Sequence, residues 1–299
     1  VFLSMGGNFV SAMSDTNATS EAISKCSLTV QISTKPNRSH LITGKIGIIL
    51  PCLGRTERDE SGGSEQFITV ENSMGVVHKS VGTRPPASNN LRSEVSIVSG
   101  IALAIEDKIG FSDIKWRELS ADYDTIRDSI ERVVPGFDSY NERCRENGGF
   151  YLPNPPRDSR IFPTKTGLAN FISNDLVSIS PNDGEFLMMT IRSHDQYNTT
   201  VYTDNDRYRG IYSGRRVVLM NKSDMEANSW EEFDEVSITS EFEQKVVTSD
   251  RWRVVEYDIP RGNVATYFPE ANVLIPLNSV ADKSNTPTSK SVIVNITST

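Results

Sequence analysis

The segment LTVQISTKPNRSHLITGKIGIIL, residues 28–50, contains two short apolar runs separated by a polar loop. The runs at 28–32 and 46–50 have the length of strands, and the second is almost wholly apolar, which is typical of a strand covered on both faces. A third apolar run lies at 1–5, and residues 19–26 have the pattern of a helix. The order strand, helix, strand predicts an open, mostly parallel sheet.

The chain then continues with a long polar stretch and two helices. Residues 52–90 are rich in Gly, Ser, Pro and charged side chains, which predicts a long irregular loop. Apolar side chains recur at helical spacing in 91–105 and again in 123–133. Four prolines gather in and directly after residues 151–162, which we interpret as a linker.

From Gly167 onward, short apolar runs alternate with turn residues. Closely spaced short strands are typical of a β-barrel or a sandwich. The predicted strands are 168–172, 186–192, 216–220, 236–239, 253–258 and 291–296, with a short helix at 223–227. We therefore expect an α/β domain with its linker over residues 1–160 and an all-β domain over residues 161–299.

The composition limits the partners of the chain. Its length of 299 residues accommodates roughly two domains, and its formal net charge is −8. This charge weighs against nucleic acid or an anionic membrane as the main partner, because both attract basic surfaces. A run of about 18 apolar residues, which a membrane span needs, is absent from the sequence.

The cysteines and histidines do not predict a metal site in this chain. Cys26, Cys52 and Cys144 lie far apart without a C-x-x-C pair, which argues against an iron–sulfur or zinc site and favours a reducing, cytoplasmic compartment. Cys52 is expected to be a small buried residue rather than a nucleophile, because no paired base is evident. The three histidines show no metal-ligand spacing.

Polar stretches follow the first three predicted strands, and ligands of open α/β sheets bind outside such strand ends. Gly6-Gly7-Asn8 lets the backbone approach a ligand closely, although a purely structural turn explains it better. Residues 33–40 supply two cations and several hydroxyl and amide donors, which suit phosphate or a base edge, but a solvated loop explains them equally well. Residues 50–57 form the third stretch.

Two stretches of the β-rich part are candidates for ligand binding. In 190–199, His194 and Asp195 are neighbours that point to opposite faces of an extended chain, so a binding loop is favoured over a catalytic dyad. The stretch 262–272, with 286–290, carries aromatic, amide, carboxylate and lysine side chains. These groups suit a purine base and its ribose, and they are equally compatible with turns of a barrel.

Five stretches in this order also carry a resemblance to a known family. They are FLSMGGNFVSAMSDT (2–16), VQISTKPNRSHLITG (30–44), ILPCLGRTERD (49–59), TIRSHDQYNTTVYTDNDRYRG (190–210) and YFPEANVLIPL (267–277). Together they resemble the C-terminal portion of formate-dehydrogenase-like molybdopterin oxidoreductases, the formate dehydrogenase alpha-like proteins. The likeness extends over nearly the whole chain, and RSHDQYNTT with DRYRG is its most specific part.

The resemblance implies a fold and a cofactor. Residues 1–160 correspond to the end of an α/β molybdopterin-binding domain, and residues 161–299 to a terminal double-psi β-barrel that covers the cofactor. The implied cofactor is bis-molybdopterin guanine dinucleotide with molybdenum or tungsten, held in the full-length protein. The metal ligand, any iron–sulfur cluster and the catalytic residues are implied to lie in the N-terminal half of the same polypeptide, which is the implied partner of this chain.

The resemblance also implies cofactor-binding residues. In the α/β part they form three strand-end loops: Gly6, Gly7 and Asn8; Ser33, Thr34, Lys35 and Arg38; and Pro51, Gly54 and Arg55. In the barrel they are Arg192, Gln196, Tyr197, Asn198 and Thr199, which wrap the pterin and diphosphate, and the late contacts Asn272 and Lys290. No catalytic or metal-binding residue is assigned to this chain, which we expect to be an inactive fragment on its own.

Two other hypotheses stay open. The chain could be a non-catalytic binding module for another phosphorylated nucleotide, or a structural domain with no small ligand. The substrate, the electron-transfer partner and the oligomeric state do not follow from these residues, and formate is an inference at the level of the family only.

Overall fold

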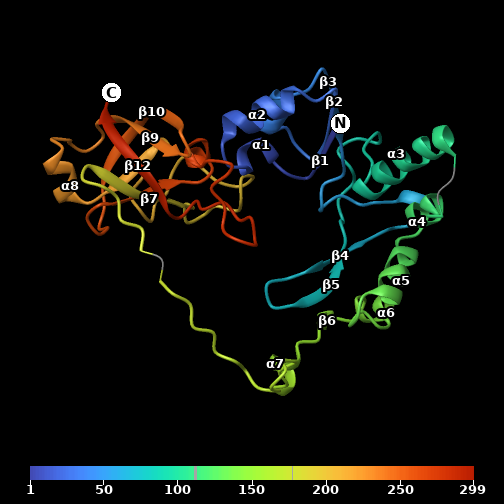
Figure 1. Ribbon diagram of the computed structural model, residues 1–299. Coiled ribbons are helices and arrows are strands. Elements are labelled where there is room, and N and C mark those ends of the chain that lie inside the picture. The colour runs from blue at the N-terminus through green and yellow to red at the C-terminus, as the bar shows by residue number, and fades with distance from the viewer. Residues whose placement is uncertain (111–112, 177) are drawn as a thin grey trace. The chain divides into compact units, whose positions relative to one another are not determined.

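The computed structural model describes residues 1–110, 113–176 and 178–299 (Figure 1). The chain separates into two compact units, and neither unit is continuous in sequence. The first unit comprises residues 1–31, 36–49 and 176–299, and the second comprises residues 32–35 and 50–175.

The N-terminal region forms a three-stranded sheet in the order β1-β2-β3. Its elements are β1 (Phe2–Met5), α1 (Phe9–Ala12), α2 (Thr16–Ser24), β2 (Leu28–Ser33), the 3-10 helix η1 (Arg38–Leu41) and β3 (Ile46–Pro51). Strands β2 and β3 run parallel, because the N–H of Lys45 donates to the Cys26 carbonyl at one end and the N–H of Cys52 donates to the Ser33 carbonyl at the other. This arrangement confirms the predicted parallel sheet.

Helix α2 begins earlier than the apolar pattern predicts. Asp15 is its N-cap, and the Asp15 carboxylate accepts a hydrogen bond from the backbone N–H of Ala18 at 3.1 Å. Such a cap satisfies a donor that the first turn leaves free, so the helix starts at Thr16. Ile23 is buried on the inner face of this helix.

The prediction that the third strand is covered on both faces is wrong for this chain. In β3, the side chains of Ile46, Ile48 and Ile49 are 59%, 41% and 52% exposed. β3 is an edge strand of its sheet, so it has a hydrogen-bonded neighbour on one side only. The described residues bury little of its apolar surface.

The C-terminal region confirms the predicted all-β fold. Six strands close a barrel in the order β10-β8-β11-β7-β12-β9. They are β7 (Glu185–Ile191), β8 (Val217–Met220), β9 (Glu235–Phe242), β10 (Lys245–Glu256), β11 (Asn263–Tyr267) and β12 (Val292–Ser298), with α8 (Lys222–Ala227) and the 3-10 helix η3 (Glu270–Leu274) between them. The pairs β8/β10 and β7/β11 are parallel, and the other pairs are antiparallel.

Apolar side chains from all six strands, including Trp252 and Met188, fill the barrel, and both of these are fully buried. Strand β11 occupies part of the stretch 262–272, for which a ligand contact and barrel turns were both left open, and no strand was predicted there. One predicted strand is wrong. The run 168–172 is not a strand, and Phe171 and Ile172 within it are fully or largely exposed.

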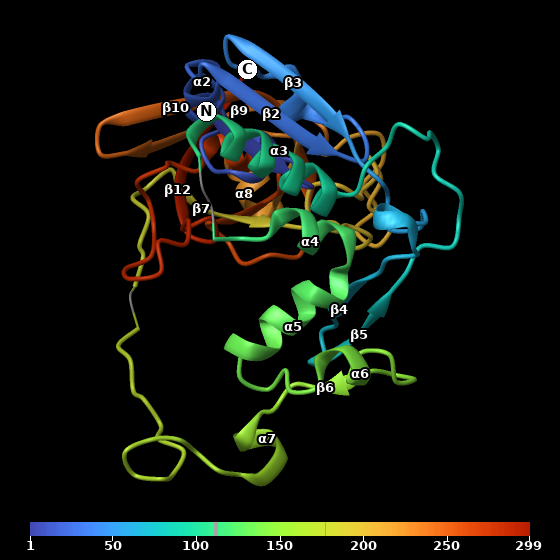
Figure 2. The ribbon, with the colours of Figure 1, turned by 90° about the vertical axis from the view of Figure 1, so that its right-hand side faces the viewer.

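The second unit is built from a small sheet and helices (Figure 2). Its elements are η2 (Ser61–Gly63), β4 (Ile68–Glu71), β5 (Val76–Ser80), α3 (Glu94–Ile109), α4 (Trp116–Ala121), α5 (Tyr123–Val133), α6 (Tyr140–Arg143), β6 (Phe150–Tyr151) and α7 (Pro155–Ser159). The two longer helices confirm the helical pattern. The hairpin β4–β5 corrects the prediction that residues 52–90 are wholly irregular. Within the described parts of the chain, no helix is long and apolar enough to cross a bilayer.

Candidate cofactor-binding site

The turn after β1 meets a loop of the barrel within the first unit. Asn8 is buried, and its Nδ2 donates to the carbonyl oxygen of Thr199 at 3.5 Å, a long hydrogen bond. The Oδ1 of the same side chain accepts from the hydroxyl of Ser39 at 3.0 Å. One amide therefore links three loops: the turn after β1, the loop after β2 and the loop after β7.

The conformation of the Gly6-Gly7 turn is fixed by the φ angle of Gly6 and by a hydrogen bond from Asn37. Gly6 has φ +71°, which favours glycine, and the Asn37 amide donates to the Gly7 carbonyl at 3.1 Å. A Cβ added at Gly7 meets no atom within 4 Å. The turn thus has free space beside it, where another group can approach the backbone.

The barrel loop between β7 and residue 202 is shaped by Arg215, which the sequence analysis did not select. Its guanidinium donates to the Ser193 hydroxyl at 2.8 Å, to Gln196 Oε1 at 2.9 Å and to the Phe268 carbonyl at 2.8 Å. It also pairs with Glu270 at 2.9 Å. A planar guanidinium with several donors fixes a loop more tightly than a single contact does.

Arg215 is nearly fully buried between two aromatic rings. Its guanidinium carbon lies 4.4 Å from the centroid of Tyr202 and 4.7 Å from that of Tyr267. Burial raises the pKa of Tyr202 and the charge of Glu270 adds to the rise, whereas Arg215 and Arg38 oppose it. The influence of Arg38 on this tyrosine connects the loop after β2 electrostatically with the barrel.

Gln196 is a predicted contact whose side chain is already engaged by protein. Its Nε2 donates to the carbonyl oxygens of Asn198 and Phe268, each at 2.8 Å. Its Oε1 accepts from the backbone N–H of Ser193 and from Arg215. These bonds give Gln196 a role in shaping the loop, and its neighbour Tyr197 is 69% exposed.

Three other predicted residues gather on this side of the barrel. Arg192 donates to Asn198 Oδ1 at 2.9 Å, and Lys290 donates to the carbonyl oxygen of Thr190, at the end of β7. Burial lowers the pKa of Lys290, and the nearby charge of Arg192 lowers it further. Two cations thus lie close enough to repel each other, and an anion between them relieves that repulsion.

Asn272 ties the barrel to the N-terminal helices. Its Nδ2 donates to the carbonyl oxygens of Ser11 at 2.8 Å and Ala12 at 3.2 Å, and its own carbonyl accepts from the N–H of Asp15. The carboxylate of Asp15 in turn pairs with Lys245. The buried side chain of Asn272 therefore joins the two parts of the first unit.

The DRYRG stretch, residues 206–210, is anchored by its first residue. Asp206 is buried and accepts hydrogen bonds from Tyr267 Oη at 2.8 Å and from Arg209 at 2.6 Å. Burial alone raises the pKa of Asp206, but these hydrogen bonds and the positive charge of Arg209 together leave the pKa below its ordinary value. Arg209 also donates to the carbonyl of Arg192, so the stretch supports the cationic side of the loop.

The remaining predicted residues belong to the second unit. The Ser33 hydroxyl donates to the Lys35 carbonyl at 2.9 Å, and the N–H of Gly54 donates to the Glu57 carboxylate at 2.6 Å. Both contacts are local and give each loop a defined backbone shape. The exposed members of this set are Thr34, Lys35, Pro51 and Arg55.

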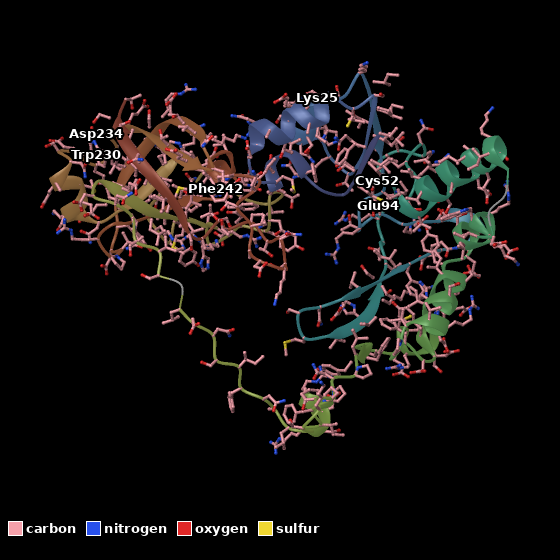
Figure 3. All side chains as sticks on the ribbon, viewed as in Figure 1. Lys25, Cys52, Glu94, Trp230, Asp234 and Phe242 are labelled. Atoms are coloured by element: carbon pink, nitrogen blue, oxygen red, sulfur yellow. The ribbon has the colours of Figure 1, made fainter. Side chains whose placement is uncertain are left out.

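Cys52 lies in the second unit near the start of α3, close to Glu94 (Figure 3). It is 3% exposed, which confirms the prediction of a buried residue. Burial raises the pKa of its thiol, and the charge of Glu94 raises it further, so the thiolate is disfavoured. In the parts of the chain that the structure describes, no group of three or more His, Cys, Asp and Glu side chains is placed to hold a metal ion.

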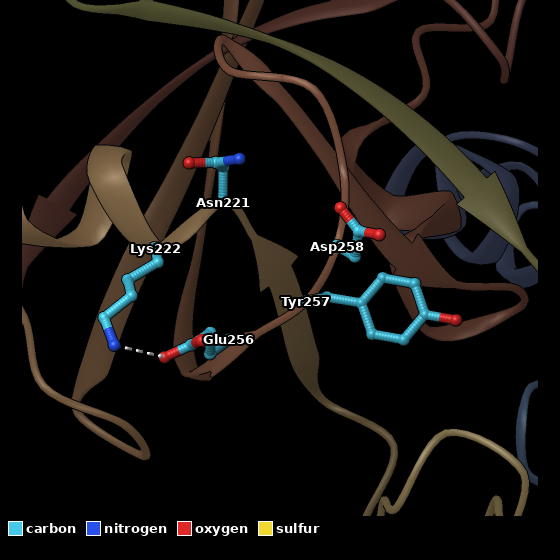
Figure 4. A pocket seen from close by; sticks show the side chains of 5 residues that line it. All are labelled: Asn221, Lys222, Glu256, Tyr257 and Asp258. Carbon is cyan, nitrogen blue, oxygen red and sulfur yellow. Dashed lines mark ion pairs between the residues drawn. The ribbon is translucent and has the colours of Figure 1, made fainter.

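Three surface hollows in the described part of the chain are lined by none of the predicted residues. One hollow of about 320 Å³ on the barrel contains an exposed ion pair, with Lys222 Nζ 3.7 Å from Glu256 Oε2 (Figure 4). Its lining residues are Asn221, Lys222, Glu256, Tyr257 and Asp258. Because its lysine is neutralised within the hollow, this surface is a poor match for an anion.

The sequence of the barrel matches a known family. Residues 186–297 match the family model described as Molydopterin dinucleotide binding domain. The closed six-stranded barrel is therefore of the type that binds a molybdopterin dinucleotide, in agreement with the predicted fold class. This match lies within the first unit and includes the loop that Arg215 shapes.

Whole-chain relatives are oxidoreductases or proteins of unspecified activity. The chain is 48% identical over 302 residues to "Uncharacterized oxidoreductase Rv2900c" of Mycobacterium tuberculosis, covering 99% of this chain and 38% of that protein. It is 39% identical over 298 residues to "Protein YdeP" of Escherichia coli K12, covering 98% of this chain and 39% of that protein. The chain thus spans about two fifths of the length of these relatives and resembles the C-terminal portion of a molybdopterin oxidoreductase.

A solved structure shares the fold. The chain superposes on acetylene hydratase from Pelobacter acetylenicus with a TM-score of 0.63 and 9% sequence identity, covering 100% of this chain and 44% of that one. At this identity the likeness concerns the fold alone.

The site contains contacts that sequence reasoning missed. Arg215 and Glu270 lie outside the predicted set, although Glu270 is part of the YFPEANVLIPL stretch. A signal for Arg215 existed in the basic pair Arg215-Arg216 directly before an apolar strand. Arginine side chains are usually exposed to solvent, so the pair alone did not distinguish a buried network from a surface charge.

Proposed function

We propose that this chain forms part of the binding site for a molybdopterin guanine dinucleotide in a formate-dehydrogenase-like oxidoreductase. The observation that carries the proposal is the link from Asn8 to both Ser39 and Thr199. It brings the turn after β1 to the loop of the barrel that matches a dinucleotide-binding family. A ligand with two ends, a pterin and a guanosine joined by a diphosphate, suits loops that converge from two parts of the fold.

The charges of the first unit fit such a ligand. Arg38, Arg192 and Lys290 are exposed, and among the described residues no salt bridge is recorded for any of them. Arginine and lysine donors bind phosphate oxygens through charge-assisted hydrogen bonds. The free space beside Gly7 provides room for the ligand at the opposite loop.

Within this proposal, each group of residues has its own task. Arg192, Lys290 and Arg38 hold the phosphate oxygens, Asn198 orients Arg192, and Tyr197 offers an exposed ring to the pterin. Gln196 and Asn272 maintain the loops that carry these contacts. For the second-unit residues Ser33, Thr34, Lys35, Pro51, Gly54 and Arg55, contact with the cofactor is proposed from the family resemblance alone.

The metal chemistry belongs to the cofactor. When bound, the molybdopterin supplies a molybdenum or tungsten centre that exchanges two electrons, and the protein supplies binding and electrostatics. We assign the metal ligand and the reacting side chains to the remainder of the polypeptide. Formate is the proposed substrate through the family resemblance, and this chain is proposed to act in the cytoplasm.

The test uses the full-length protein with Arg192→Ala and Lys290→Ala. Losing one charge-assisted hydrogen bond costs about 1.5–3 kcal/mol, so each variant is expected to retain clearly less cofactor after gel filtration. Metal content is measured by elemental analysis, and GMP is measured after acid hydrolysis. Lys222→Ala, which removes an exposed lysine at the hollow of Figure 4, is the matched control and is expected to keep its cofactor.

Two results of this experiment count against the proposal. Full metal and GMP content in both Arg192→Ala and Lys290→Ala means that these side chains do not hold the phosphates. Release of a nucleotide other than GMP from the unmodified protein, with neither molybdenum nor tungsten, favours a binding module for another phosphorylated nucleotide.

A further inference from the structure

His40 has a fixed hydrogen-bonding role on one side of its ring. It lies in η1, and only 9% of its surface is exposed. Its Nδ1 lies 2.9 Å from the backbone N–H of Asn37 and accepts from it, as part of the capping box of this short helix. Because Nδ1 accepts, a neutral ring carries its proton on Nε2.

The contacts of Asn37 support this tautomer. Nδ1 of His40 also lies 3.2 Å from the carbonyl and side-chain oxygens of Asn37, which are longer contacts. The side-chain oxygen already accepts from the N–H of Ser39 at 2.9 Å. The short contact to the Asn37 N–H therefore decides the orientation of the ring proton.

The other ring nitrogen lacks a partner. Nε2 of His40 is a buried atom without a hydrogen bond among the residues that the structure describes. A buried N–H donor without an acceptor destabilises a fold, so such groups are usually paired in the complete protein. The Nε2 proton therefore requires an acceptor beyond the residues that the structure describes.

The neighbours of His40 connect its loop to the proposed cofactor site. Asn37, three residues earlier, donates to the Gly7 carbonyl, and Ser39 both donates to Asn8 and accepts from the N–H of Val10. The loop that carries the imidazole is thus fastened to the turn that has free space beside it. Arg38, adjacent in sequence, adds a cation to the same loop.

We infer that Nε2–H of His40 donates a hydrogen bond to a phosphate oxygen of the bound dinucleotide. This inference rests on the proposed function and adds a neutral, directional donor to its exposed cations. Nε2 is covered by protein atoms, so the approaching oxygen displaces part of that cover when it binds. The alternative acceptor is a carbonyl oxygen from the remainder of the polypeptide.

Two substitutions in the full-length protein separate the two sides of the ring. His40→Asn places an amide near the position of Nδ1, so it can keep the capping contact to Asn37 but cannot donate from Nε2. His40→Gln places an amide nitrogen near the position of Nε2 and gives up the capping contact. Thr266→Val is the control, because Thr266 also has a buried hydroxyl without a partner, but within the barrel strand β11.

The measurement is the rate at which GMP-yielding cofactor is lost from each purified protein during dialysis, together with the melting temperature of the cofactor-free form. We expect His40→Asn to lose cofactor about tenfold faster or more, because a hydrogen bond to a charged group is removed. His40→Gln should recover part of this loss, and Thr266→Val should match the unmodified protein. The cofactor-free melting temperature of His40→Asn should be unchanged.

Three results overturn the inference. An unchanged cofactor loss rate in His40→Asn, together with a lower melting temperature of its cofactor-free form, assigns the acceptor to the polypeptide. Fast cofactor loss in His40→Gln, with His40→Asn like the unmodified protein, assigns the effect to the cap instead. An unchanged loss rate and melting temperature in His40→Asn shows that Nε2 has no partner at all. If the unmodified protein yields no GMP, the proposed function itself fails.

Discussion

Strands β8 and β3 are both short apolar runs, VVLM and IGIILP, yet their surroundings differ completely. In β8 every side chain is at most 1% exposed, because the strand pairs with β10 and β11 and its faces are covered within the first unit. In β3 the three isoleucines are 41–59% exposed. Both of these apolar runs form the predicted strands, but the side chains are buried only where the same chain supplies the covering layers.

The polar groups do not show the same contrast. The barrel gives Arg215 four hydrogen-bond partners and two aromatic rings. Among the described residues, however, Ser240 Oγ, Thr266 Oγ1 and Glu270 Oε2 of the barrel region are buried without a partner, like Nε2 of His40 in the loop after β2. The chain spans about two fifths of the length of its relatives. The six barrel strands close on one another, whereas β3 is an exposed edge strand of the N-terminal sheet. We propose that the N-terminal sheet and its loops are completed by the cofactor and the remainder of the polypeptide.

The largest loss of stability is expected from a change of Arg215, which lies just before β8. Arg215→Ala leaves the Glu270 carboxylate without its partner, and breaking such a buried pair costs about 3–5 kcal/mol. Urea denaturation of the chain measures this loss of unfolding free energy. The double variant Arg215→Ala with Glu270→Gln should recover part of the loss, and a change below about 1 kcal/mol in Arg215→Ala would contradict the closed network that we describe.

A similar loss is expected from the core of β8. Leu219→Ala creates a cavity at a fully buried site, which lowers the unfolding free energy by about 2–5 kcal/mol. The midpoint of urea denaturation should fall accordingly, with an unchanged slope. An unchanged midpoint in Leu219→Ala would mean that the barrel repacks easily, and it would contradict the contrast with β3.

The acid response of the barrel gives an intermediate effect. The pKa of Asp206 is lower in the folded protein than the value of about 3.9 in an unfolded chain. Its ionised form therefore stabilises the fold above pH 4, and this contribution is lost as the pH falls through the folded pKa. Unfolding measured from pH 6 to pH 2.5 should show a smaller acid loss in Asp206→Asn than in the unmodified chain. Parallel curves would show that Asp206 has no such role.

The smallest effect is expected in β3. Ile48 is 41% exposed, so Ile48→Thr, which keeps a β-branched side chain, should change the unfolding free energy of this chain by less than about 1 kcal/mol. The same substitution in the full-length protein should cost more if the additional polypeptide covers this strand. An equal, small cost in both proteins would mean that β3 stays exposed throughout.

The fold was largely predictable because local patterns determine strands and helices. Five of the six barrel strands overlap predicted apolar runs, but β11 was not predicted as a strand, and its stretch was left open between a ligand contact and barrel turns. The run 168–172 failed in the opposite way. Its residues have strand-like composition, but no strand of the described chain pairs with them.

The candidate site was predictable only as a set of separate loops. That loops follow strand ends could be inferred from sequence, but the contact between Asn8 and Thr199 joins residues 191 positions apart. No spacing rule encodes such a contact, because it depends on how the barrel and the N-terminal sheet pack. The role of Arg215 escaped for the same reason, since its four partners come from distant parts of the barrel sequence.

A structure of the full-length protein with its cofactor would decide whether the two sets of loops serve one ligand. We expect a guanine dinucleotide that contacts both the Gly6–Asn8 turn and the loop at residues 192–199. A dinucleotide that contacts neither of them, or only one, would contradict the shared site that we propose.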